Sequence, residues 1–209
     1  MRYEMIAGPE CEPVTLAEAK DHLRLSSDAE DAYIASLITA ARHAVEAHLE
    51  LFLITRQIDL YMDSWPVGKN LLWWDGVMDG AWVNLRNSGG YVALPVKPVS
   101  LITQVVTIDG AGVETVMDPA LYYLQPGDRP RLYKSNVSSW PAVVRAADGI
   151  RLRLNVGFGD SWNTVPELIR QALLHLVAYL YANRGDEPGA AITLSGVRNF
   201  LGPYRETRV

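Results

Sequence analysis

The stretch VPELIRQALLHLVAYLYANRG, residues 165–185, predicts one long helix that is buried along its whole length. Its apolar residues recur at helical spacing and form one continuous stripe: Ile169, Ala172, Leu173, Leu176, Val177 and Leu180. Burial of the five larger side chains contributes on the order of 10 kcal/mol before conformational entropy is subtracted. Leu174, Tyr179 and Tyr181 widen the apolar surface, so we expect cover from another helix and from a neighbouring subunit.

Two further helices are predicted near the other end of the chain. The first lies in TLAEAKDHLRL, residues 15–25, where Thr15 and Glu18 have the spacing of a capping box. The second follows in residues 28–53, and its apolar stripe comprises Ile34, Leu37, Ile38, Ala41, Val45 and Leu49. Neither helical part has enough apolar surface to fold alone. We therefore expect the two ends of the chain to pack on each other.

The residues between the helical parts have the pattern of β-strands. Apolar and polar side chains alternate in QIDLYMD, residues 57–63, and in IRLRLNV, residues 150–156. Asp109-Gly110 between two β-branched runs predicts a hairpin. The expected fold is therefore α+β, a helical core with an inserted antiparallel β region.

This pattern divides the chain into four expected parts. They are an N-terminal helical part (1–56), an inserted β region (57–160), a C-terminal core helix (161–186) and a C-terminal arm (187–209).

Residues 64–90 form a segment rich in tryptophan and glycine, with Trp65, Trp73, Trp74 and Trp82. Clustered tryptophans can fold back as a small satellite core or anchor a protein interface. They can also stack on sugars or bases, a use that the sequence favours less. The segment therefore leaves a carbohydrate- or peptide-binding module as the alternative function.

Composition limits the possible classes of protein. Hydrophobic residues make up 49% of the chain and charged residues 21%, as in ordinary globular proteins. No apolar run reaches the roughly 20 residues that cross a membrane, so no membrane association is expected. Cys11 is the only cysteine, which excludes an intrachain disulfide and a cysteine-ligated zinc site within one chain.

The net charge is −5, which argues against a broad DNA-binding surface. Basic residues gather locally at 129–134 and at 145–153, and Arg198, Arg205 and Arg208 lie in the tail. We expect each of these groups to be solvated.

The sequence contains no recognisable catalytic motif and no phosphate-binding loop. Among the histidines, His43 and His48 are five residues apart, which is not the spacing of a helical metal pair. His175 lies beside the stripe of the long helix and is interpreted as a packed or interfacial residue. We therefore expect no enzyme activity, no catalytic residues, no cofactor and no metal. The residues expected at an interface with another subunit or a partner protein are Trp73, Trp74, Trp82, His175 and Tyr179.

Five blocks of sequence, taken in order, resemble the head–tail connector (adaptor) proteins of tailed bacteriophages, which also occur in prophages and gene transfer agents. These blocks are PVTLAEAKDHLRL (13–25), DAEDAYIASLITAARHAVEAHL (28–49), LPVKPVSLITQVVTID (94–109), NVGFGDSWNTVPELIRQALLHLVAYLYANRG (155–185) and FLGPYR (200–205). Each block is weak alone, but their order and spacing are specific. The Trp-rich segment is longer than expected for the family.

The resemblance implies a structural protein of the virion neck that is assembled in the cytoplasm of the bacterial host. Family members form a ring, commonly of twelve subunits, below the portal protein. Such a ring extends the DNA channel and holds the next neck or tail component, and DNA passes through it without specific binding. A chain of this kind is expected to be monomeric or loosely associated until it meets the portal.

The resemblance also implies that the C-terminal segment reaches toward the portal. The residues that correspond to this contact here are Val197, Phe200, Leu201, Pro203, Tyr204 and Arg205. After Gly185 the sequence suits a flexible arm that orders on a partner. A short C-terminal helix folded back on its own core is the alternative.

Overall fold

The computed structural model describes residues 1–65, 90–135 and 139–205. The chain divides into a sheet unit, residues 1–7 and 57–155, and a helical unit, residues 8–56 and 156–209. Helices and antiparallel strands are both present, which confirms the α+β fold class. Residues 1–7, expected with the helices, belong to the sheet unit, because their four-residue strand pairs with a strand of the insertion.

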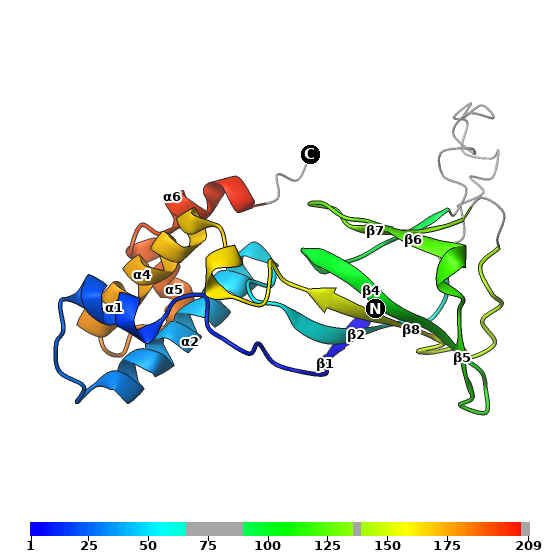
Figure 1. Ribbon diagram of the computed structural model, residues 1–209, viewed down its shortest axis with the longest axis horizontal. Coiled ribbons are helices and arrows are strands. Elements are labelled where there is room, and N and C mark those ends of the chain that lie inside the picture. Colours follow the sequence, from blue (N-terminus) through cyan, green and yellow to red (C-terminus); the bar gives the residue numbers. More distant parts are fainter. Residues whose placement is uncertain (66–89, 136–138, 206–209) are drawn as a thin grey trace. The chain divides into compact units, whose positions relative to one another are not determined.

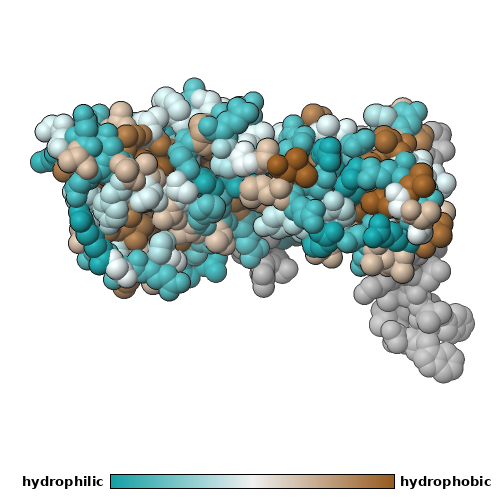
Figure 2. All heavy atoms as spheres, turned by 90° about the horizontal axis from the view of Figure 1, so that it is seen from below, coloured by the Kyte–Doolittle hydropathy of each residue, from teal (hydrophilic) through white to brown (hydrophobic). Residues whose placement is uncertain are grey.

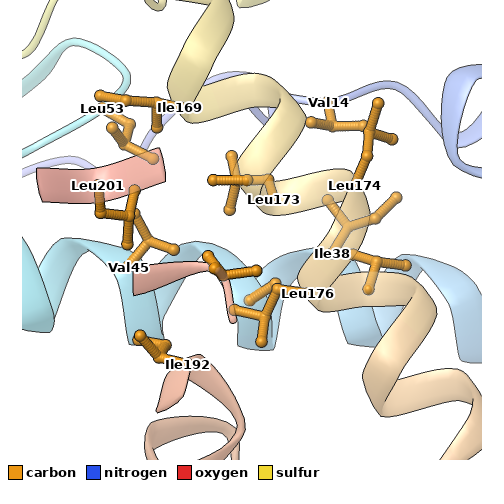
Figure 3. Packing of buried hydrophobic residues seen from close by; sticks show 14 of the residues in the cluster. Val14, Ile38, Val45, Leu53, Ile169, Leu173, Leu174, Leu176, Ile192 and Leu201 are labelled. Atoms are coloured by element: carbon orange, nitrogen blue, oxygen red, sulfur yellow. The ribbon is translucent and has the colours of Figure 1, made fainter. Parts of the chain in front are cut away.

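The helical unit gathers five helices around one hydrophobic cluster (Figures 1 and 3). Their bounds are α1 (Leu16–Leu23), α2 (Asp31–Leu49), α4 (Glu167–Ala182), α5 (Pro188–Leu194) and α6 (Arg198–Leu201), with 3-10 turns η3 (Trp162–Thr164) and η4 (Gly202–Tyr204). The central helix α4 contacts the other four helices. Its predicted stripe is buried at all six positions. The two ends of the chain therefore pack on each other, as the sequence predicts.

The helix boundaries follow from local chemistry. The capping box is present, because Thr15 accepts from the Glu18 backbone N–H and Glu18 accepts from the Thr15 backbone N–H. Helix α2 ends at Leu49, earlier than expected, since Glu50 adopts the left-handed conformation that ends helices. Helix α4 begins one residue after Pro166, which caps it.

The sheet unit contains two antiparallel sheets (Figure 1). The first has the order β1-β2-β8-β4-β5 and the second the order β3-β7-β6. Their strands are β1 (Arg2–Met5), β2 (Arg56–Met62), β3 (Tyr91–Ala93), β4 (Val99–Ile108), β5 (Glu114–Val116), β6 (Tyr122–Gln125), β7 (Arg131–Lys134) and β8 (Ile150–Val156), and η2 (Pro119–Leu121) precedes β6. The hairpin predicted at Asp109-Gly110 joins β4 to β5.

Gly157 allows two chain segments of the helical unit to run against each other. Its φ of 127° is left-handed, and an added Cβ would lie 2.5 Å from the backbone nitrogen of Thr55. Hydrogen bonds from Phe158 N to Leu53 O (3.1 Å) and from Thr55 N to Gly159 O (2.9 Å) hold the segments together. A side chain at position 157 therefore conflicts with both the local conformation and the neighbouring backbone.

We expect Gly157→Ala to lower the free energy of unfolding by at least about 1–3 kcal/mol, the usual cost of a strained backbone residue. Chemical denaturation measures the change. Gly189→Ala is the matched control, because nothing lies within 4 Å of its added Cβ and the residue is helical. A Gly157→Ala variant as stable as the control would contradict the close approach.

Candidate binding surfaces

The C-terminal segment, residues 188–205, packs on the helical core. Helices α5 and α6 contact α4, and α5 also contacts α2. Ala191, Ile192, Val197 and Leu201 are buried. Residues 188–204 thus adopt the alternative that the sequence left open, a helical end folded back on its own core.

This placement separates the six residues expected at the portal into two groups. Val197 and Leu201 are fully buried, so they hold the segment in place and are not free to touch a partner. Phe200 and Tyr204 are half-buried, while Pro203 and Arg205 are exposed. The surface that can meet a partner is therefore formed by Phe200, Pro203, Tyr204 and Arg205.

His175 and Phe200, expected at different interfaces, lie together on the helical unit. The His175 ring stacks on Phe200 with 5.3 Å between centroids and meets the His22 ring edge-on, also at 5.3 Å. Burial and the nearby charge of His175 lower the pKa of His22. Tyr179 donates a 2.9 Å hydrogen bond to Asp186 and so stabilises the end of α4.

The end of α2 faces the basic residues of the C-terminal segment. Burial lowers the pKa of His48, and the charges of Arg205 and Arg198 lower it further. The folded protein therefore holds His48 neutral more strongly than the unfolded chain does. Protonation of His48 weakens folding, since the unfolded state takes up the proton more readily.

We expect the free energy of unfolding to rise with pH in the region of the ordinary histidine pKa of about 6.5 and to fall as the pH drops below it. His48→Gln should flatten this dependence, as measured by urea titrations at several pH values. Arg198→Gln should flatten it in part, because it removes one of the two positive charges. A wild-type slope unchanged by both substitutions would contradict this arrangement.

The interface tryptophans Trp73, Trp74 and Trp82 lie outside the described residues. Trp65, the first tryptophan of the segment, is buried in the sheet unit. Its ring stacks on Trp140 at 4.3 Å, and its Nε1 donates to Pro141 O at 2.9 Å. This side chain therefore serves the internal packing.

A row of three tyrosines crosses the small sheet. Tyr91, Tyr133 and Tyr123 are cross-strand neighbours, with ring centroids 5.3 Å apart for each adjacent pair. The guanidinium of Arg131 lies over Tyr91 at 4.7 Å. Arg131, expected to be solvated, is thus part of an aromatic surface.

A buried ion-pair network was not anticipated from the sequence. Glu46 of α2 accepts from Arg42, from Arg56 and from the Leu53 backbone N–H. Arg42 also donates to Glu12 at 2.7 Å. Arg42, Glu46 and Arg56 are all buried. The i, i+4 spacing of Arg42 and Glu46, beside the apolar stripe of α2, is the feature of the sequence from which an ion pair could have been predicted.

An apolar groove opens on the helical unit beside the N-terminal end of α1. It has a volume of about 300 Å³. Its lining comes from three parts of the unit: the segment that leads into α1 (Cys11, Glu12, Val14, Thr15 and Leu16), helix α2 (Ala35, Ile38 and Thr39), and Trp162 of η3. The Cys11 Sγ donates to Asp160 O at 3.3 Å, and burial raises the pKa of this thiol.

Charge divides unevenly between the two units. By sequence, the sheet unit has equal numbers of basic and acidic residues, so the helical unit carries the whole net charge of −5. On the face in Figure 2, hydrophilic and intermediate residues cover most of the helical unit. Within it, residues 195–209 are basic, with three arginines and one glutamate. The rest of the helical unit is therefore strongly acidic.

Other kinds of site were sought in the described ranges. No group of three or more His, Cys, Asp or Glu there is placed to hold a metal ion. No helix in the same ranges is long and apolar enough to cross a bilayer.

Comparisons with known proteins cover different shares of the chain. Residues 13–69 match the family model of phage gp6-like head-tail connector proteins. No curated protein matches the chain.

Solved structures of gene transfer agent (GTA) particles contain similar chains. A chain from the virion of a native particle is 29% identical with a TM-score of 0.77, and its alignment covers 100% of this chain and 97% of that one. A chain from the neck of an empty particle computed with C6 symmetry is 28% identical with a TM-score of 0.75, and the coverage is again 100% and 97%. A chain from the neck of a native particle computed with C12 symmetry is 27% identical with a TM-score of 0.73, at the same coverage of 100% and 97%.

Proposed function

We propose that this protein, whose resemblance to phage head–tail connectors is confirmed by its sequence and its full-length fold, is a structural subunit of the neck of a phage-like particle. The observation that carries this conclusion is the match to neck chains over the whole of this chain. A shared helical core alone would leave the sheet unit unexplained. Because the alignment spans both units, the likeness to those neck chains includes the sheet unit.

The finer proposal is a ring that docks below the portal protein and joins the head to the next neck or tail component. The matched chains come from necks computed with sixfold and twelvefold symmetry, which supports a ring with twelve subunits. The surface of the C-terminal segment around Phe200, Pro203, Tyr204 and Arg205 is the portal contact in this proposal. The protein acts by binding and positioning, without a chemical step.

The charge distribution supports passage of DNA through such a ring. A channel that bound DNA tightly would carry a basic surface, and tight binding would slow the movement of the genome. The sheet unit is neutral by sequence and the helical unit is acidic. A subunit with this balance suits a channel that DNA crosses without stable binding.

The proposal is tested by mixing the purified protein with the portal protein of its own particle and separating the products by gradient sedimentation. The protein should move with the portal, at a native mass that corresponds to one ring of this chain for each portal ring. The same protein mixed with an unrelated phage portal is the control. Sedimentation of the protein apart from its own portal, at concentrations where both are folded, would contradict the proposed function.

A further inference from the structure

The apolar groove beside Cys11 is large enough to receive a side chain from another molecule. Its volume of about 300 Å³ is roughly twice that of an engineered apolar cavity of about 150 Å³ that accommodates benzene. Val14 and Ile38 form an apolar floor that is almost wholly buried, and Trp162 is a half-exposed wall. The groove is thus a preformed apolar site with one open side.

Acidic residues lie in and beside this groove, and Glu12 lines it. Glu10, Glu12 and Asp160 all act on Cys11 electrostatically. Glu12 is bound to Arg42, but Glu10 and Asp160 form no ion pair with another described residue and are exposed. The occupant that fits best is therefore an apolar side chain that is followed by positive charge.

The same chain carries such a feature at the end of α5. Leu194 is 63% exposed, the largest exposed fraction among the large hydrophobic residues of the described helical unit. Arg198 follows four residues later, without an ion pair to another described residue, and opens the basic stretch 195–209. Leu194 is thus an exposed apolar side chain that is followed closely in the sequence by a positive charge.

Two residues of the groove and helix α5, which ends at Leu194, lie at different ends of the hydrophobic cluster. In Figure 3, Val14 and Ile38, which line the groove, lie at one end of the hydrophobic cluster, and Ile192 of α5 lies at the other. Two complementary patches on different sides of one molecule make a heterologous contact, and such contacts close into rings when the rotation between copies allows it. The patches are therefore placed for head-to-tail association of identical copies.

We propose that the groove formed by Cys11, Val14, Ile38 and Trp162 receives Leu194 of the next copy in the ring, with Arg198 of that copy facing Glu10 and Asp160. The inference rests on the proposed ring and names the surfaces that build it. Each subunit donates Leu194 to one neighbour and accepts Leu194 from the other. The apolar contact supplies cohesion, and the charges favour one relative orientation.

Cys11 makes this contact directly testable, because it is the only cysteine in the chain. In rings of the Leu194→Cys variant formed on the portal, a short bismaleimide should join Cys11 of one subunit to the introduced thiol of the next. Mildly alkaline pH is used, since burial raises the pKa of the Cys11 thiol. The expected product is a ladder of covalent oligomers that ends at the ring size.

Two matched variants control for chance collisions. Leu194→Cys combined with Cys11→Ala should give no ladder, because only one thiol remains in each subunit. Val144→Cys places a thiol at an exposed position of the sheet unit (78% exposed) and should give no ladder with Cys11.

Leu194→Asp should raise the concentration needed for ring formation at least about tenfold, whereas Val144→Asp should not change it.

The outcomes separate this interface from the proposed function. The interface is supported if rings of Leu194→Cys on the portal give the ladder and Leu194→Asp assembles less well than wild type. If wild-type rings form normally on the portal but rings of Leu194→Cys give no ladder and Leu194→Asp assembles as wild type, the interface is overturned and the proposed function stands. A wild-type protein that forms no ring on its portal would overturn both.

Discussion

Replacement of Glu46 with alanine is expected to lower the free energy of unfolding by about 3–5 kcal/mol, the usual cost of removing one partner from a buried ion pair. The Arg56 side chain is 2% exposed and loses its carboxylate partner. The Leu53 backbone N–H, which donates to Glu46 at 3.0 Å, also loses its acceptor. The Arg56 guanidinium is then buried without a carboxylate and the Leu53 N–H without this acceptor, and each change adds to the loss of stability.

Two further variants divide this effect into its causes. Glu46→Gln keeps an oxygen that can accept from Leu53 N but removes the charge, so we expect a smaller loss than for alanine. Glu46→Ala combined with Arg56→Met removes both partners and should recover part of the loss, since an apolar side chain tolerates burial without a carboxylate. Glu10→Gln, at an exposed position, is the surface control.

Equilibrium urea denaturation followed by circular dichroism measures these four variants. If Glu46→Ala unfolded at the same urea concentration as Glu10→Gln, the buried network would not contribute to stability. If the double variant were no more stable than Glu46→Ala, the unpaired Arg56 would not be the main cause.

Replacement of Tyr204 with alanine and Arg205 with glutamate in one variant is expected to weaken portal binding about 100-fold or more. Central tyrosine and arginine side chains of an interface often contribute about 2 kcal/mol or more each, and reversal of the charge adds repulsion. Arg205 is exposed and Tyr204 is half-buried, so both can reach a partner. The fold should survive, because Val197 and Leu201 remain in the core.

This double variant is a sharper test than removal of residues 195–209. The sequence alone predicts that the truncation spares the fold, but the truncation also removes the fully buried Val197 and Leu201 and would expose the core. Loss of binding after truncation would thus not separate docking from folding. Arg129→Glu, a charge reversal at an exposed site of the sheet unit, is the matched control.

Surface-immobilised portal and biolayer interferometry give the affinity. We expect Arg129→Glu to bind like wild type, and the double variant to bind far more weakly while it still shows a cooperative thermal transition. If the double variant and the control bound the portal with equal affinity, residues 204–205 would not be part of the portal contact.

The parts of the fold that sequence predicts are those fixed by local periodicity and caps. The stripe of α4, the Thr15–Glu18 capping box and the Asp109-Gly110 hairpin each depend on residues close together in the chain. Strand β1 was missed because its four residues are all exposed, which leaves no alternation of buried and exposed positions to detect.

Tertiary contacts decide the features that the sequence left open or missed. The sequence after Gly185 is compatible with an arm or with a folded end, and only the buried sites for Val197 and Leu201 favour the second. The ion pairs of Glu46 and Arg42 join residues from 12 to 56, and the spacing of charges along one helix does not reveal Arg56 as a partner. The pairing of His175 with His22 and Phe200 joins three helices and is equally invisible to periodicity.

Assembly of this chain into a ring on a portal can be observed by electron microscopy of the wild-type protein mixed with its own portal. We expect a single ring of twelve copies at one end of the portal, coaxial with the portal channel. Portal particles with bare ends, in a mixture where this protein is folded and in excess, would contradict it.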